Sequence, residues 1–338
     1  MSSAVFTLES HDRKHWGYYG SLVMAAANFG TLMGSFAGWI LRETLTHEQL
    51  YSWGWRLPFL SGIFVSFSGC YLRGDDDGTE ALHSPPQPQS ADNNHDDDDD
   101  ETNDNLHPIP SQLPLERPNP IRVALEPQNR RSLLASAMVP MLWSSGFYLS
   151  FIWMAIFMED LSNKPMSSSF AINATALLLS VCLLFPVAGI LSDKYGRRAI
   201  MTIGATFMGL GAPLLIFIIG LGQPLLALLS QIMIGIALSC FGAPMVAWLV
   251  ESFEPEARLT SVSIGYNLAQ ATVGGMTPAL ATFMVDSLGP SSPGIILFGV
   301  SLISLLGLWV VAPSFRHQKV PSSDVDECEE ADDDIELI

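Results

Sequence analysis

Charged residues are scarce in this sequence, and its long apolar runs contain almost none. Asp, Glu, Lys and Arg together make up 15% of the 338 residues, whereas hydrophobic residues make up 49%. The mean hydropathy is positive. A soluble domain rarely has such a composition. The shortage of charge therefore predicts an integral membrane protein of the all-α class, a polytopic helical bundle.

Cysteine and histidine are also few. The four cysteines include no closely spaced pair of the metal-binding type, and all seven histidines lie outside the apolar runs. These patterns argue against a disulfide framework, a metal site and an intramembrane histidine relay. The chain also lacks a nucleophile elbow, a zinc motif and a phosphate-cradling loop. We therefore expect no enzyme, no catalytic residue, no cofactor, no metal and no nucleic-acid partner.

The net charge of −18 comes from two short segments. Residues 74–119 and 324–338 contain 22 of the 34 acidic residues, and the rest of the chain has 15 basic and 12 acidic residues. Such segments bury too little apolar surface to fold. We expect a disordered acidic linker over 74–131 and an acidic tail over 316–338. The linker is interpreted as solvated chain, and the alternatives are a regulatory or partner-binding loop or a weak calcium-binding segment. A partner of the linker or of the tail is of unknown identity.

Eight apolar runs are long enough, or nearly so, to cross about 30 Å of hydrocarbon. They predict eight transmembrane helices over residues 17–41, 55–72, 132–157, 169–191, 200–221, 225–249, 261–284 and 294–312. The second run is the shortest, and Trp53, Trp55 and Phe59 flank it as interfacial residues do. The lipid bilayer is therefore an expected partner.

Basic residues are distributed unevenly between the loops. If both termini are cytoplasmic, thirteen basic residues face the cytoplasm, and only Arg42, Arg56 and Lys164 face the other side. Cytoplasmic loops of membrane proteins carry an excess of Lys and Arg. The sequence thus predicts a multi-pass protein with both termini cytoplasmic, and we expect it in the plasma membrane.

The loop Gly189-Ile-Leu-Ser-Asp-Lys-Tyr-Gly-Arg-Arg198, between the fourth and fifth runs, is rich in charge and glycine. Its pattern resembles the signature loop of the major facilitator superfamily of secondary transporters. Further segments resemble, in family order, loops and helix starts of the metabolite:proton symporters, which include proline/betaine, alpha-ketoglutarate and shikimate carriers. These segments are residues 9–21, 53–59, 251–258, 263–267 and 274–278.

The resemblance implies two six-helix halves with substrate bound between them. On this alignment the eight runs correspond to helices five to twelve of the family. Residues 1–73 are then a remnant of the amino-terminal half, and 132–315 form the carboxy-terminal half. The implied function is secondary transport of a small organic solute, an organic acid or zwitterion, by proton symport with alternating access. The alternative is a truncated, transport-inactive protein that acts in membrane interaction or regulation.

A gating role on the cytoplasmic face is predicted for the glycine-rich loop and for the loop before the seventh run. Gly189 and Gly196 are expected to permit a tight turn, and Asp193 to approach the positive amino end of the seventh run. Arg197 is expected to face Glu251 or neighbouring acids. The alternative for the basic residues is that they only fix topology. The predicted gating set is Gly189, Asp193, Gly196, Arg197, Arg198, Glu251 and Arg258.

Two further assignments remain open in the sequence. Glu251 and Arg258 belong either to a network with Asp193 and Arg197 or to a solvated surface pair worth about 0–1 kcal/mol. Polar and aromatic residues at mid-span are either solute contacts or links between helices, because buried amides and hydroxyls need partners. The predicted substrate-binding residues are Tyr148, Trp153, Gln231, Tyr266, Asn267 and Gln270, with Ser144 and Ser145 as further candidates. Protons as a partner follow from the resemblance alone.

Overall fold

The computed structural model of the chain describes residues 1–60, 62–63, 67, 121, 125–127, 129–162, 164–253 and 255–312. The described residues form helices and no strands, which confirms the all-α class. Half of the predicted second span (55–72) and most of the predicted acidic linker (74–131) lie outside the described residues, and the acidic tail (316–338) lies entirely outside them. These three assignments stay predictions.

Contacts divide the chain into two compact units, residues 1–36 with 119–338 and residues 37–118. The division falls within helix α2 (Trp16–Thr44). In the second unit, α2 is followed by α3 (His47–Ser52), η2 (Gly54–Arg56) and α4 (Leu57–Leu60). Thr46 caps α3, because its hydroxyl accepts a hydrogen bond from the Gln49 N–H while the Gln49 side chain accepts one from the Thr46 N–H.

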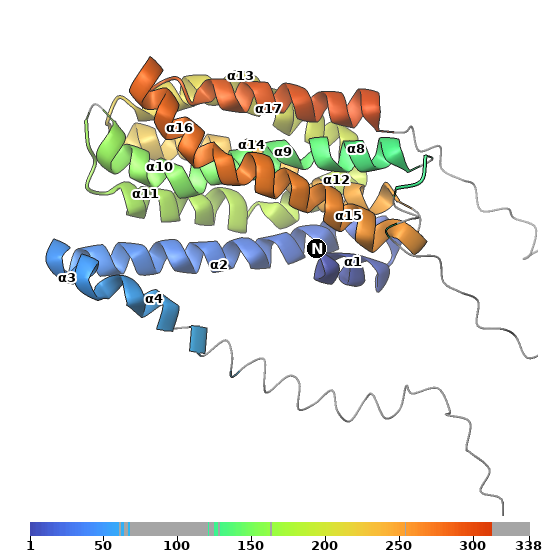
Figure 1. Cartoon of the computed structure of the whole chain (residues 1–338), viewed down its shortest axis with the longest axis horizontal. Helices are drawn as coiled ribbons and strands as arrows, with labels where there is room; N and C mark the ends of the chain where they lie inside the picture. Colours follow the sequence, from blue (N-terminus) through green and yellow to red (C-terminus); the bar gives the residue numbers. More distant parts are fainter. Residues whose placement is uncertain are drawn as a thin grey trace, which may run out of the picture. The chain divides into compact units, whose positions relative to one another are not determined.

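The first unit contains the remaining helices (Figure 1). It begins with α1 (Ser2–Glu9), η1 (Arg13–His15) and the first part of α2. It continues with α8 (Arg130–Met138), α9 (Pro140–Phe147), η3 (Tyr148–Trp153), α10 (Met154–Ile156), η4 (Phe157–Leu161), α11 (Ser169–Ala176), η5 (Leu177–Cys182), α12 (Phe185–Tyr195), α13 (Arg197–Ile219), α14 (Pro224–Glu251), α15 (Pro255–Ala269), η6 (Gln270–Gly274), α16 (Gly275–Leu288), α17 (Gly294–Leu306) and η7 (Gly307–Val311).

Consecutive helices join into long apolar segments. Among the described residues, seven segments are long and apolar enough to cross a membrane, namely Arg13–Thr44, Arg130–Leu161, Ser169–Tyr195, Arg197–Ile219, Pro224–Glu251, Arg258–Leu288 and Gly294–Val311. They coincide with seven of the eight predicted runs. The chain is therefore a polytopic helical membrane protein, as the scarcity of charge predicted.

Helix α14 runs through the core of the first unit. It packs against α11, α12 and α13, and α13 in turn packs against α17 (Figure 1). Phe151, Phe185 and Phe241 are among the largest fully buried side chains. Prolines at 213, 244 and 278 lie inside helices α13, α14 and α16. Transmembrane helices tolerate such breaks because neighbouring groups satisfy the freed carbonyls.

Several long segments contain a π-helical stretch. Within the described residues these stretches are η3, η4, η5, η6 and η7. Such widened turns inside α-helices are frequent at functional sites. Two of them begin at predicted substrate-binding residues, η3 at Tyr148 and η6 at Gln270. The backbone thus departs from regular helix at the positions of these two side chains.

Candidate functional site

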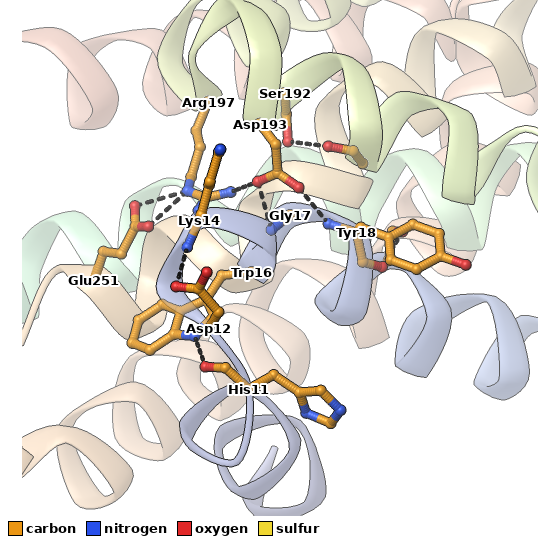
Figure 2. A network of polar contacts seen from close by, with 12 residues as sticks. His11, Asp12, Lys14, Trp16, Gly17, Tyr18, Ser192, Asp193, Arg197 and Glu251 are labelled. Atoms are coloured by element: carbon orange, nitrogen blue, oxygen red, sulfur yellow. Dashed lines mark hydrogen bonds and ion pairs between the residues drawn. The ribbon is translucent and has the colours of Figure 1, made fainter.

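Asp193, in the last turn of α12, binds the first turn of α2 (Figure 2). Its Oδ1 accepts a hydrogen bond from the Gly17 N–H at 2.8 Å, and its Oδ2 accepts one from the Tyr18 N–H at 2.9 Å. The first N–H groups of a helix have no partner within the helix and carry partial positive charge. Asp193 therefore caps α2 from a distant segment of the chain.

This contact corrects the predicted partner of Asp193. The carboxylate was expected to meet the amino end of the seventh run, residues 261–284, and this expectation was wrong. The physical reason is that α12 lies against the amino end of α2, so the N–H groups of Gly17 and Tyr18 are the ones within reach. The type of contact, a carboxylate at a helix amino end, is the one that was predicted.

Gly189 permits the close approach of α12 and α2. It lies inside α12 and makes no turn, contrary to the prediction. A Cβ atom at this position would lie 2.6 Å from the carbonyl oxygen of Gly17 and would also collide with Ser21. Any larger residue would therefore push the two helices apart. Gly196 does form the predicted turn, because it links α12 to α13 with a φ of +94°.

Arg197 connects two carboxylates (Figure 2). Its Nη1 donates to Asp193 Oδ1 at 2.8 Å, and its Nε donates to Glu251 Oε1 at 2.7 Å. The side chains of Arg197 and Asp193 are only 12% and 11% exposed, so water and salt screen this pair less than a surface pair. The contact with Glu251 is the one predicted. Through Arg197, the network joins α12, α13 and α14 to the amino end of α2.

Arg258 has a partner that the sequence did not indicate. Its Nη1 donates to Glu9 Oε1 at 2.6 Å, and its side chain is 7% exposed. Arg258 thus pairs with Glu9 rather than with Glu251, and its burial rules out a solvated surface pair. The reason is that α1 packs beside α15 and supplies the nearer carboxylate. This second ion pair joins the end of α1 to the first turn of α15.

A cavity of about 350 Å³ is lined by Met1 and by residues of α1, α2, α9, η3, α15 and η6, all in the same unit. Three of the predicted substrate-binding residues line it, Tyr148, Tyr266 and Gln270. Gln270 Nε2 donates to the Tyr266 hydroxyl at 3.0 Å. Helix α2 contributes Asn28 and Thr31 to the lining. The volume is at the lower end of the range for small-molecule sites.

The other three predicted substrate-binding residues do not line this cavity. Trp153 donates its indole N–H to the Thr282 hydroxyl at 2.9 Å, which ties η3 to α16. Gln231 Nε2 donates to Asn173 Oδ1 at 2.5 Å and is fully buried, so it ties α14 to α11. Asn267 is exposed. Trp153 and Gln231 thus follow the alternative interpretation, in which mid-span polar groups link helices.

The structure adds residues that sequence reasoning missed. Asn28 and Thr31 lie in the first apolar run, where no candidate had been sought. A single amide in the middle of an otherwise apolar span was the available signal. Glu9, Gly17 and Tyr18 belong to the segment 9–21 that carried the family resemblance. Their partners could not be inferred, because those partners lie more than 170 residues away along the chain.

Comparison with known proteins agrees with this architecture. The family model described as Major Facilitator Superfamily matches residues 134–327. The chain is 25% identical over 327 residues to an inner membrane metabolite transport protein of Escherichia coli, YhjE, covering 94% of this chain and 67% of that protein.

Two further relatives are named for their solutes. A citrate-proton symporter of Klebsiella pneumoniae is 24% identical over 309 residues, which is 90% of this chain and 62% of the symporter. A proline/betaine transporter of Salmonella typhimurium is 24% identical over 290 residues, with coverages of 84% and 53%. The chain thus spans roughly half to two thirds of the length of the curated relatives it matches.

Proposed function

The chain belongs to the Major Facilitator Superfamily, and on that premise we propose that it takes part in secondary active transport of a small organic solute, an organic acid or a zwitterion. It is an integral multi-pass membrane protein, and its relatives are transporters rather than enzymes. The observation that carries the proposal is the capped amino end of α2. The helix that Asp193 holds at its first turn also lines a cavity of solute size.

We propose a gating role for this contact because of its chemistry. Alternating access requires contacts that hold in one state and break in another. The contact of Asp193 with the amino end of α2 is polar, so water can replace its partners when the helices separate. Arg197 links the same carboxylate to Glu251, so that α12, α13 and α14 would release α2 together.

The remaining members of the predicted gating set take supporting roles. Gly189 sets the distance between α12 and α2, and Gly196 sets the turn into α13. Arg258 joins α1 to α15 through Glu9. Its guanidinium also lies 5.6 Å from the ring centroid of Trp16, the first residue of α2. Arg198 lies in the first turn of α13, and we propose that it keeps this loop cytoplasmic by its charge.

The orientation, location and division of the chain belong to the same proposal. The excess of basic residues in alternate loops supports cytoplasmic termini, and we propose the plasma membrane as the site. Residues 132–315 would be the carboxy-terminal six-helix half of the transporter, and residues 1–73 would belong to the amino-terminal half. The acidic segments 74–131 and 316–338 would be cytoplasmic.

The solute and the coupling ion are proposed from the relatives. One relative is named for citrate and protons, and another for proline and betaine. We propose that this chain likewise acts on a small carboxylate-bearing solute together with protons. The alternative function, a transport-inactive interaction protein, gains no support from these relatives.

Transport by the reconstituted protein tests the proposal. The full chain would be purified, inserted into liposomes and given an inward proton gradient, and the uptake of radiolabelled proline, glycine betaine and citrate would be measured. We expect gradient-dependent accumulation of at least one solute. Liposomes without protein and liposomes treated with a protonophore are the controls. If no solute enters faster than in protein-free liposomes, the proposed function is wrong for this chain.

A further inference from the structure

Two residues that line the cavity beside α2 each have a buried polar atom without a hydrogen-bond partner. Asn28 is only 4% exposed, and its Nδ2 makes no hydrogen bond. Gln270 Oε1 is also buried and accepts no hydrogen bond. Both residues line the same cavity, Asn28 from α2 and Gln270 from η6. Buried polar groups are almost always paired, and an unpaired one is costly.

The two free atoms have opposite hydrogen-bonding character. The Asn28 amide N–H can only donate, and the Gln270 carbonyl oxygen can only accept. A ligand that satisfies both must present an acceptor to Asn28 and a donor to Gln270. The Gln270 side chain is held in place, because its Nε2 already donates to the Tyr266 hydroxyl at 3.0 Å. The acceptor at this position is therefore preorganised.

Aromatic rings surround the same space. Tyr148 and Tyr266 line the cavity together with Trp143 and Phe147. The face of an aromatic ring attracts an organic cation. A ligand whose donor group is an ammonium would thus gain from both the Gln270 oxygen and the neighbouring rings.

We propose that this cavity binds a small zwitterion through Asn28 and Gln270. The solute carboxylate accepts a hydrogen bond from Asn28 Nδ2, and the solute ammonium donates one to Gln270 Oε1 among the aromatic rings. This inference rests on the proposed function and narrows it, since the solute is then a zwitterion with an N–H group rather than an organic acid. Asn28 and Gln270 become residues that determine specificity.

Equilibrium binding to the purified full chain in detergent tests this assignment. The probes are L-proline, its N,N-dimethyl derivative, which keeps the ring and carboxylate but has no N–H donor, and citrate. We expect the protein to bind proline at least about tenfold more tightly than the dimethyl derivative, because the latter leaves Gln270 Oε1 unpaired. Tighter binding of citrate or of the dimethyl derivative, or no saturable binding of proline, would overturn the proposal.

Substitutions assign the two contacts. Asn28→Leu and Gln270→Met should each weaken proline binding at least about tenfold. Gln270→Met should also abolish the preference for proline over its dimethyl derivative. Asn267→Leu is the matched control, because Asn267 is an exposed amide in the same long helical segment outside the cavity. We expect it to change affinity less than twofold. Unchanged proline affinity in both cavity variants would refute the proposal.

Thermal stability separates a binding role from a structural one. Asn28 Nδ2 makes no hydrogen bond, so Asn28→Leu should not lower the midpoint of thermal unfolding in the absence of solute. A lower midpoint together with weaker binding would instead assign Asn28 a structural role and overturn its part of the proposal.

Binding and transport can fail independently. If proline binds with the expected variant pattern but is not accumulated by liposomes, the inference stands and the proposed function fails. Conversely, liposomes could accumulate a solute that binds the wild type, Asn28→Leu and Gln270→Met with the same affinity. That result would support the proposed transport function and refute the zwitterion site.

Discussion

Replacing Asp193 by Asn should release the amino end of α2 from α12. The carboxylate accepts hydrogen bonds from the N–H groups of Gly17 and Tyr18 and from Arg197 Nη1, at 2.8, 2.9 and 2.8 Å. An Asn side chain keeps the shape but has one acceptor oxygen and one donor NH₂ group. At least one of these donors would then lose its acceptor, and the favourable charge at the helix end would be lost.

The size of the effect follows from these contacts. A hydrogen bond to a charged group contributes about 1.5–3 kcal/mol, and a charge at a helix end adds about 0.3–1 kcal/mol. We therefore expect Asp193→Asn to weaken the contact by about 2–4 kcal/mol, which corresponds to about 30- to 1,000-fold in its equilibrium constant.

Hydrogen–deuterium exchange of the peptide that contains residues 17 and 18 reads out this contact directly. If local opening governs exchange, these two amides should exchange about 30- to 1,000-fold faster in Asp193→Asn. Solute uptake should slow strongly, while the amount inserted in the membrane stays the same. Lys194→Gln is the matched control, because Lys194 is the exposed neighbour in the same turn. Unchanged exchange and unchanged uptake in Asp193→Asn would refute the reasoning.

Three further substitutions test the packing around the site. Gly189→Ala should lower the free energy of unfolding by about 1–3 kcal/mol, because the new Cβ meets the Gly17 carbonyl oxygen at 2.6 Å. The measurement is a lower midpoint of thermal unfolding. Gly196→Val should slow uptake without loss of membrane insertion, since a β-branched residue at a φ of +94° costs about 1–3 kcal/mol. Gln231→Leu should lower thermal stability by about 1–2 kcal/mol through the loss of its bond to Asn173, which calorimetry can measure.

Each of these changes has its own control or contrary result. Gly299→Ala places a Cβ where no atom lies within 4 Å, so it should not destabilise the protein. Normal uptake by Gly196→Val would show that the turn does not contribute to gating. An unchanged unfolding midpoint in Gln231→Leu, with reduced solute binding, would mean that Gln231 contacts the solute rather than linking helices.

Part of the fold could be predicted because it depends on local properties of the chain. Apolar length and the absence of charge fix where a helix can cross a bilayer. These properties located the seven spans that the structure describes. The turn at Gly196 was also local, because it requires only one residue that adopts a positive φ.

The candidate site was predicted less completely, because its contacts join distant segments. The sequence placed Tyr148, Tyr266 and Gln270 among the solute contacts but could not separate them from Trp153 and Gln231. All five are polar or aromatic residues within apolar runs. Both glutamines leave their side-chain oxygen without a partner, and only packing decides that Gln231 meets Asn173 while Gln270 lies beside a cavity.

The sequence by itself determined the class, the seven apolar spans that the structure describes, the family resemblance and the charged loop around Asp193. Only the tertiary structure decided that Asp193 caps α2 and that Arg258 pairs with Glu9. It also decided that Asn28 shares a cavity with Gln270. The physical reason is that hydropathy and turn preference are properties of a short stretch of chain. The partner of a charge or an amide depends instead on which helix ends and faces the packing brings within about 3 Å.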